Sequence, residues 1–502
     1  MTAATAAYDA LLAHTRETAL LGSTSALLAW DQETYMPRGA GEVRAQQLAL
    51  LAKLQHERTT DPRVAEWLHT CENDPQLAAD GDRAANVRGL RRDYDRATRL
   101  PATLVTALAE LESRAQQEWA DARSKSNFRR FQPWLERMVA LQQQKADCLT
   151  RPGQSRWDAL ADLYEPGMNA ASLRELFAPL RQRLVALRQK LARGKAPAET
   201  FGRAVVDEAR QQAFGRAVLT AMGFDLQRGR IDQSAHPFCT STGGDVRLTT
   251  RYHRDRVLDA LGSTMHEGGH GLYEQGLDPR HLGTPLGEAV SLGIHESQSR
   301  LWENHVGRSA AFWHWCWPLA QQHLGAACDG HTAESVYRES NVVRPSLIRV
   351  EADEATYDLH VMIRFDIEQQ LIDGQLGTSN LPDVWNTLYR DCLGVQVPDD
   401  KHGCLQDVHW SCGLFGYFPT YTLGNVYAGC LYKAMRAALP DLDADLARGD
   451  VSAATGWLRE KLQRHGGLNP PRETVRLAAG FEPDEGPLLD YLEAKFGALY
   501  GL

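Results

Sequence analysis

Apolar side chains recur three and four residues apart along most of this 502-residue chain, and this periodicity restricts the fold more than any other feature. Clear examples are Leu48, Leu51 and Leu54, and the longer series between residues 173 and 187. Such spacing places apolar side chains on one face of a helix. Proline and glycine interrupt the pattern at 37–39, 61–62, 101, 152–153 and around 197. We therefore predict a mainly α-helical protein, with helix following helix over residues 1–235.

The texture changes near residue 235. Two Thr- and Val-containing stretches, 236–242 and 245–250, flank the pair Gly243–Gly244, a pattern typical of a β-hairpin. We expect this hairpin to be the only clear sheet, because the helical pattern resumes at Arg254 and continues to the end. No change in composition marks a linker. The chain is thus predicted to be one domain, 1–502, with a helical N-terminal part (1–235) and a catalytic part (236–502).

Composition excludes several classes of function. A formal net charge of -9 argues against nucleic acid as the main partner, since phosphate binding needs a basic surface. No run approaches the roughly 18 apolar residues that span a bilayer. The nine cysteines are odd in number and include no CxxC pair, which indicates a reducing compartment. The N-terminus lacks the features of a signal peptide. We expect a soluble cytoplasmic enzyme.

The segment HEGGH, residues 266–270, is the strongest single indication of chemistry. It lies in a stretch, 254–273, with a helical apolar stripe, so His266 and His270 are expected on one helix face. Two imidazoles spaced in this way can bind one zinc ion, with Glu267 placed as general base. Gly268 and Gly269 weaken a helix by about 1 kcal/mol each relative to alanine. They indicate either an accidental match in a loop or a place where a neighbouring backbone or the substrate approaches closely.

A catalytic zinc site needs a third protein ligand and one open position. The helix-like stretch 289–306 and the residue before it offer four candidates, which are Glu288, His295, Glu296 and Glu303. We prefer Glu296, which follows His266 by 30 residues, because a second helix that returns a glutamate to the metal is the gluzincin pattern. His295 or Glu303 would then be surface groups.

Six ordered motifs resemble the carboxypeptidase Taq family of metallopeptidases. They are HPF at 236–238, DxRxT at 245–249, HEGGH at 266–270, HESQ at 295–298, IRxxAD at 348–353 and GxxQDxHW at 403–410. The early stretch WDQETYMP at 30–37 also looks like the start of that family. The resemblance implies a large helical, two-lobed body around a deep cleft with a small sheet, similar to the neurolysin-like gluzincin peptidases. It also implies one zinc ion per chain, with cobalt as an alternative, and a homodimer.

The resemblance extends to residues that would stabilise the oxyanion. By similarity to related oligopeptidases, Tyr421 is the first choice as a phenol donor, and His409 and Tyr417 are second choices. Aromatic side chains in such a segment can instead pack the core, which is an equally good interpretation of Tyr417.

A carboxypeptidase must also bind a free carboxylate, and arginine suits this task by bidentate pairing. Arg349 is the candidate; its alternative is an internal ion pair with Glu351, Asp353 or another acid. His236 and Arg247 are expected to line the cleft beside an edge strand that could bind peptide. Bracing of the hairpin through an Asp245–Arg247 pair is the favoured role for that arginine. Asp407 is expected to orient a metal ligand or His409.

The sequence therefore predicts a broad-specificity zinc metallocarboxypeptidase that acts on peptides with a free C-terminal carboxylate, without nucleic-acid or membrane partners. A zinc oligopeptidase that cuts short peptides internally is the nearest alternative. A catalytically silent helical binding scaffold is the alternative from a different class.

Overall fold

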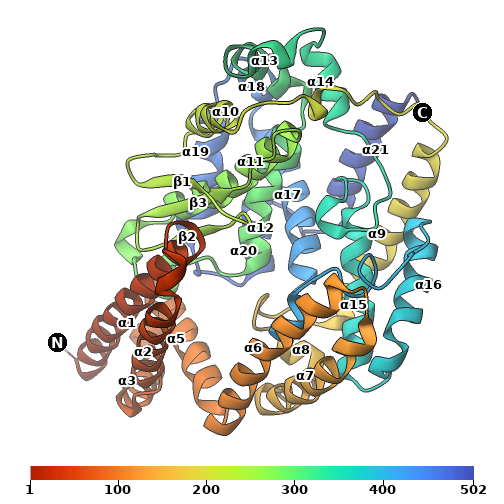
Figure 1. Ribbon diagram of the computed structural model, residues 1–502. Helices are drawn as coiled ribbons and strands as arrows, with labels where there is room; N and C mark the ends of the chain where they lie inside the picture. Colours follow the sequence, from red (N-terminus) through yellow and green to blue (C-terminus); the bar gives the residue numbers. More distant parts are fainter. Residues whose placement is uncertain (1) are drawn as a thin grey trace.

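A computed structural model describes residues 2–502 and confirms the mainly helical fold (Figure 1). Pro62 begins one helix and Pro101 precedes another, as the sequence predicts, because proline fits the first turn of a helix but not its interior. The helices before the sheet are α1 (Ala3–Thr34), α2 (Gly41–Thr59), α3 (Pro62–Glu72), α4 (Pro75–Ala79), α5 (Gly81–Arg99), α6 (Ala102–Ser124), α7 (Phe128–Leu149), α8 (Arg156–Ala161), α9 (Ala170–Leu191) and α10 (Glu208–Ala221).

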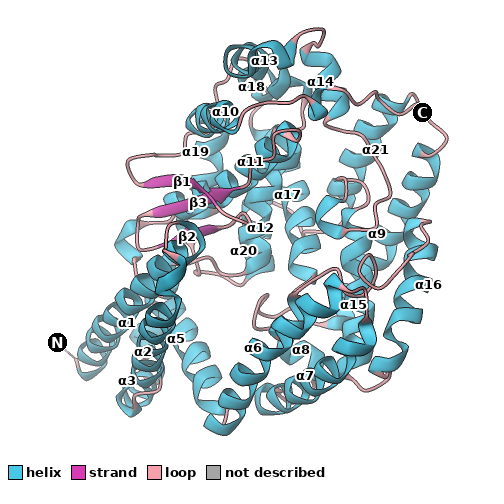
Figure 2. Ribbon diagram, in the orientation of Figure 1, coloured by secondary structure: helices cyan, strands magenta, loops and turns pink. Residues whose placement is uncertain are grey.

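The sheet is small and lies beside the central helices (Figure 2). Its strands are β1 (Gly229–Gln233), β2 (Cys239–Ser241) and β3 (Val246–Thr250), in the order β1-β3-β2. Strands β2 and β3 are antiparallel and form the predicted hairpin. Its turn contains Gly243 and Gly244, whose φ angles of 79° and 106° favour glycine. The hairpin prediction is confirmed.

Strand β1 corrects the expectation that residues 1–235 are entirely helical. It pairs in parallel with β3, so that Gly229 lies opposite Val246. Parallel pairing depends on a partner from outside the strand's own hairpin, and the five-residue segment is too short to show an alternating pattern. The strand was therefore not visible from local sequence.

The helices of the catalytic part surround a central group formed by α11, α12 and α17 (Figure 1). The helices after the sheet are α11 (Val257–Gly276), α12 (Leu292–Arg300), α13 (Ala310–Leu324), α14 (Ala333–Glu339), α15 (Tyr357–Ile372), α16 (Leu381–Leu393), α17 (Pro419–Ala438), α18 (Leu442–Ala447), α19 (Ser452–Lys461), α20 (Pro471–Ala479) and α21 (Gly486–Tyr500). A π-helix, η5 (Leu301–Val306), continues α12, and short 3₁₀ turns include η7 (Arg349–Glu351) and η9 (His409–Cys412).

Two glycines allow the central helices to approach one another. A Cβ on Gly269 of α11 would lie 2.5 Å from the carbonyl oxygen of Gln298 and 2.7 Å from the Cα of Ser299, both on α12. A Cβ on Gly424 of α17 would lie 2.4 Å from the Cγ of Glu296. Both positions therefore require glycine. The HEGGH glycines do not mark a loop, since the whole segment lies within α11.

The N-terminal helices α1, α3, α4 and α5 share a small apolar core of their own, separate from the main core. Trp30 at the end of α1 connects them to the sheet, because the Arg247 guanidinium lies 4.1 Å from the centre of its indole ring. Within residues 2–502, no helix is long and apolar enough to cross a membrane, and no disulfide joins the nine cysteines.

Candidate metal centre and active site

Three side chains from two helices converge at the centre of the molecule. His266 and His270 lie one turn apart on α11, and Glu296 lies on α12. One carboxylate oxygen of Glu296, Oε2, lies 3.7 Å from Nε2 of His266 and 3.5 Å from Nε2 of His270. A ligand atom from each of the three lies within 4.8 Å of the other two. The four-residue spacing of the two histidines on α11 and the packing of α12 against that helix produce this arrangement.

The geometry of the three donors fits a divalent metal. Their separations exceed ordinary hydrogen-bond lengths, so the groups face one another without bonding directly. Ligand bonds of about 2.0–2.1 Å in a tetrahedral arrangement place neighbouring donors about 3.3 Å apart. The observed separations are close to this value. Two imidazole nitrogens and one carboxylate oxygen are also a donor set of catalytic zinc sites.

The charges around the centre are strongly coupled. Burial lowers the pKa of His266, but Glu296 and Glu303 outweigh it and raise that pKa to about 8. Burial and the nearby His295 lower the pKa of His270 to about 3. Burial alone would raise the pKa of Glu296, yet Arg300 and the two histidines hold it well below its usual range. Glu296 is therefore ionised and His270 neutral, which are the forms that bind metals, whereas His266 must lose a proton when a metal binds.

A set of outer groups fixes the three donors. Nδ1 of His266 donates to Oε2 of Glu303 at 2.9 Å, which leaves Nε2 directed at the centre. Nε of Arg300 donates to Oε1 of Glu296 at 2.7 Å, which leaves Oε2 for the centre. Arg300 also contacts Glu303, with Nη1 3.3 Å from Oε2. Glu303 belongs to the π-helix η5, a type of local widening that is frequent at functional sites.

The carboxylate of Glu267 is not among the three converging donors. Glu267 lies next to His266 on α11. Only 6% of its surface is exposed, and burial raises its pKa to about 7. Strand β2 packs against α11, and burial together with the charges of Glu267 and Glu274 raises the pKa of the Cys239 thiol on that strand.

A group of aromatic side chains lies on the other side of the centre, near Glu296. Nε2 of His409 and the hydroxyl of Tyr421 lie 3.3 Å apart, and the rings of Tyr417 and Tyr421 are 5.5 Å apart. Burial raises the pKa of both tyrosines, and the Glu296 carboxylate contributes to each shift. Tyr357, which the sequence did not single out, packs edge-on against Tyr421. The three candidate aromatic residues thus contact one another, and Tyr357 links Tyr421 to Arg300, the partner of Glu296.

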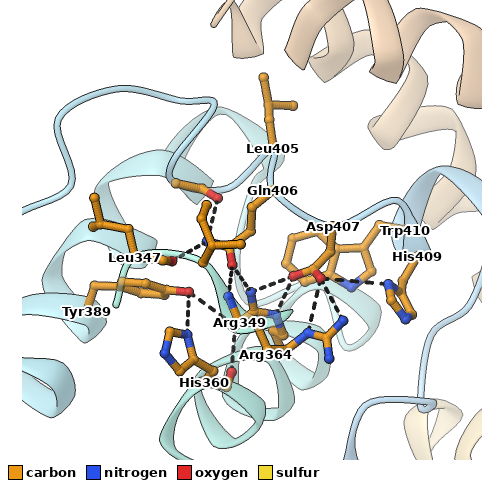
Figure 3. A network of polar contacts seen from close by, with 12 residues as sticks. Leu347, Arg349, His360, Arg364, Tyr389, Leu405, Gln406, Asp407, His409 and Trp410 are labelled. Carbon is orange, nitrogen blue, oxygen red and sulfur yellow. Dashed lines mark hydrogen bonds and ion pairs between the residues drawn. The ribbon is translucent and has the colours of Figure 1, made fainter. Parts of the chain in front are cut away.

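Arg349 lies in a buried ion-pair network with Asp407 and Arg364 (Figure 3). Its Nε and Nη2 donate to Oδ1 of Asp407 at 3.1 and 3.0 Å, and its Nη1 donates to the Tyr357 hydroxyl at 2.8 Å. Arg364 donates to the other carboxylate oxygen at 2.5 Å. One carboxylate thus lies between two guanidinium groups, and the network keeps a net positive charge.

This network corrects the expectation for Asp407. The carboxylate was expected to orient a metal ligand or His409, but Nδ1 of His409 lies 4.0 Å from Oδ1, beyond hydrogen-bond distance. Asp407 binds the two arginines instead. Burial, with a contribution from Arg349 and Arg364, lowers the pKa of His409 to about 3, so its imidazole is neutral. The internal-pair alternative for Arg349 is present, with Asp407 as the acid.

The two sheet candidates differ in their surroundings: Arg247 is paired within the hairpin, whereas His236 is exposed. Nη2 of Arg247 donates to Asp245 at 2.7 Å, which is the favoured hairpin pair, and the same guanidinium covers Trp30. His236 is exposed just before β2, and its carbonyl accepts a hydrogen bond from the Ser234 hydroxyl. Neither side chain has a contact with His266, His270 or Glu296 among the hydrogen bonds and ion pairs of residues 2–502.

Two candidates for the third ligand have other roles. His295 lies with Nε2 2.9 Å from Oε1 of Glu274 and stacks on His270, with ring centres 4.4 Å apart. Glu303 is neither a ligand nor a surface group, since it holds His266. Sequence reasoning missed this role, although Glu303 follows Glu296 by seven residues, or two helical turns. It also missed Arg300, which is four residues from Glu296 and therefore on the same face.

Residues 10–496 match the protein family described as carboxypeptidase Taq (M32) metallopeptidase. The chain belongs to this family. A Taq-family chain is a metallocarboxypeptidase, so the resemblance found in the sequence is confirmed and the silent-scaffold alternative is not supported. The family also implies a divalent metal and peptide substrates.

Relatives of this Taq-family chain match it over nearly its whole length. It is 46% identical to thermostable carboxypeptidase 1 of Thermus thermophilus, over 99% of both chains. It is 36% identical to carboxypeptidase 1 of Bacillus subtilis, over 95% of both. The M32 carboxypeptidase structure from Deinococcus radiodurans is 42% identical, with a TM-score of 0.96 over 99% of this chain and 100% of that one.

Proposed function

We propose that this chain is a zinc-dependent carboxypeptidase of broad specificity, in which His266, His270 and Glu296 bind the metal and Glu267 is the general base. The convergence of these three donors, at separations that match a tetrahedral metal, is the observation that carries the proposal. Cobalt has the same preference for imidazole and carboxylate donors and is the expected alternative metal. A metal bound there would act as a Lewis acid toward the peptide carbonyl and would make an attacking water more acidic.

The residues around the metal have distinct proposed tasks. The Glu267 carboxylate takes a proton from the attacking water and delivers it to the nitrogen of the leaving amine. The Tyr421 hydroxyl donates to the developing oxyanion, and the neutral His409, 3.3 Å away, holds that hydroxyl in place. Tyr417 packs against Tyr421 and can take the same position.

Arg349 is the proposed anchor for the C-terminal carboxylate of the peptide. A guanidinium has five N–H donors, and three of those of Arg349 are engaged by Asp407 and Tyr357. The remaining donors and the net positive charge of the Arg349–Asp407–Arg364 network favour an anion there. The other face of the site has strand β2 at an edge of the sheet, where an extended peptide can add as a strand; His236 and Arg247 flank that edge.

Peptides with blocked ends distinguish the carboxypeptidase from the oligopeptidase. We expect the metal-loaded enzyme to remove single C-terminal residues from a free-acid peptide and to leave its C-terminally amidated form intact, as measured by mass spectrometry of the digests. An N-acetylated peptide serves as control and should be cleaved normally. Internal cleavage of the amidated peptide at the same rate would establish the oligopeptidase instead.

The setting of the enzyme is also proposed. Residues 1–502 are expected to act as one catalytic domain, because the helices of both parts contact one another throughout the main core. A cytoplasmic homodimer is the proposed form, from the reduced cysteines and the family resemblance. Sedimentation of the purified protein tests the dimer.

A further inference from the structure

A cavity of about 650 Å³ lies between the end of η5 and helices α13, α14, α17, α18 and α21. Its walls include His305, Arg308, Tyr432, Lys433, Tyr491 and Lys495, and contain none of the proposed ligands or catalytic groups. We propose that this cavity is a second ligand site, which binds a small organic carboxylate carrying a flat ring and is coupled to the metal centre.

The cationic side chains of the cavity have donors to spare. Within residues 2–502, Lys433 makes no hydrogen bond or ion pair, and its ammonium lies 5.5 Å from the ring of Phe481. Arg308 uses Nη2 to bind Glu303 and has further N–H groups free. Lys495 donates to Glu354 and to the Tyr491 hydroxyl, which leaves one of its three N–H groups. A carboxylate is the acceptor that such donors bind best.

The wall also contains aromatic rings that suit a flat ligand, together with small residues and two aspartates, Asp443 and Asp490, that are already paired with Arg436 and Arg183. The imidazole of His305 packs against both Tyr491 and Tyr432, with ring centres 4.1 and 4.7 Å away. Only 2% of His305 is exposed, and its Nδ1 has no hydrogen-bond partner in the part of the chain that is described. Aromatic rings gain most from stacking or edge-on contact with another ring. The cavity volume is within the range of small-molecule sites.

One arginine connects the cavity to the metal centre. Nη2 of Arg308, in the cavity wall, donates to Oε1 of Glu303 at 3.2 Å. Oε2 of the same carboxylate accepts the hydrogen bond from Nδ1 of His266 at 2.9 Å. Glu303 and His305 belong to the π-helix η5, and Arg308 follows it by two residues. The segment from Glu303 to Arg308 thus forms part of both the metal centre and the cavity.

This connection predicts whether a ligand in the cavity strengthens or weakens metal binding. The prediction rests on the metal site proposed above. A bound carboxylate would draw Arg308 away from Glu303. Glu303 would then interact more strongly with His266, and a stronger hydrogen bond at Nδ1 makes Nε2 a better metal ligand. Ligand in the cavity is therefore expected to tighten metal binding, and metal must tighten ligand binding by the same factor.

Three related probes test the site by isothermal titration calorimetry on the full-length, metal-loaded protein. Indole-3-acetate carries the ring and the charge, indole-3-acetamide lacks the charge, and acetate lacks the ring. We expect indole-3-acetate to bind about tenfold more tightly than either control, since a charge-assisted hydrogen bond and a stacked ring each contribute about that much. Lys433→Gln should weaken its binding by a similar factor, with cleavage of a test peptide unchanged. Arg459→Gln, at an exposed position on α19, is the matched control.

The coupling is read from metal affinity, measured by competition with a chelator. Saturating indole-3-acetate should tighten metal binding about fivefold. At the indole-3-acetate concentration that just saturates the unaltered protein, Lys433→Gln should show a smaller effect, because less of the variant is occupied; this also separates the cavity from carboxylate binding at the peptide site. Equal binding of all three probes, or unchanged binding and coupling in Lys433→Gln, would overturn the second site. If the protein binds no metal at all, the proposed function fails, whereas the probe comparison still decides whether the cavity is a site.

Discussion

At the scale of single residues, the centre keeps the three proposed metal ligands apart from the proposed general base. Glu267 is adjacent to His266 in sequence, yet its carboxylate stands outside the converging donors. This position supports the proposed role of Glu267 as a general base.

Glu267→Gln is accordingly expected to lower kcat by about 10²- to 10⁴-fold, because the amide cannot accept the proton. Metal content, measured by elemental analysis, should stay at the level of the unaltered enzyme. Loss of metal together with activity would show that Glu267 acts as a ligand.

Glu303, in contrast to Glu267, is expected to affect metal binding more than the reaction itself, since it contacts a proposed ligand but no reacting atom. Glu303→Gln removes the charged partner of His266 Nδ1, and we expect metal affinity to fall about 10- to 100-fold. At saturating metal the KM for peptide should change little. Glu334→Gln on α14, an exposed carboxylate, is the control. An unchanged chelator competition curve for Glu303→Gln would rule out the positioning role.

At the scale of secondary-structure elements, the metal centre depends on how closely three helices pack. Gly269 is the contact point of α11 with the α12 backbone, and Gly424 is the contact point of α17 with Glu296. Gly269 of HEGGH, which would weaken an isolated helix, is thus required by the neighbouring helix α12.

Two glycines on the same helix provide a matched test. Gly269→Ala forces a methyl group against backbone atoms and should lower the free energy of unfolding by about 1–3 kcal/mol, with weaker metal binding. Gly262→Ala meets nothing within 4 Å and should raise it by about 0.5–1 kcal/mol. Urea unfolding measures both. Equal effects of the two substitutions would contradict the close-packing argument.

The sequence predicted the elements whose cause is local. The helical spacing of His266 and His270, the Gly243–Gly244 turn and the proline helix starts all depend on neighbouring residues, and each was found where expected. Strand β1 and the Asp407 network depend on partners that are distant in the chain, so local patterns could not show them. Glu303 was a candidate for the third metal ligand, but its contact with Nδ1 of His266 depends on how α12 and η5 pack against α11.

At the scale of the whole molecule, Glu368 on α15 connects distant parts of the chain. Its carboxylate accepts hydrogen bonds from Trp410 at 2.9 Å, from the backbone of Gly416 at 2.9 Å and from Trp157 at 3.4 Å. The residue is fully buried, and burial raises its pKa to about 7. It therefore links helix α8 to the segment that carries His409 and Tyr417.

This carboxyl should give part of the stability a pH dependence. Its ordinary pKa is 4.5, so between pH 4.5 and about 7 the folded protein holds a proton that the unfolded chain has lost. The contribution is full below pH 4.5 and is lost as the pH rises through about 7. Glu368→Gln cannot titrate, and its Tm relative to the unaltered protein should rise between pH 5 and pH 8.

Thermal unfolding at several pH values checks this expectation. The exposed Glu175→Gln on α9 should keep a constant difference in Tm over the same range. A Glu368→Gln difference that does not vary with pH would show that Glu368 titrates alike in the folded and unfolded chain.

The position of α12 between α11 and α17 also bears on how long a metal stays bound. Glu296 cannot withdraw alone, because it is packed on both sides. Gly269 of α11 lies against the backbone of α12, and Gly424 of α17 lies against the side chain of Glu296. Release must therefore wait for the three helices to separate together. We expect metal exchange to be slow and to follow the rate of this cooperative opening, so that the lifetime of the loaded enzyme is a property of helix packing and not of any single ligand bond.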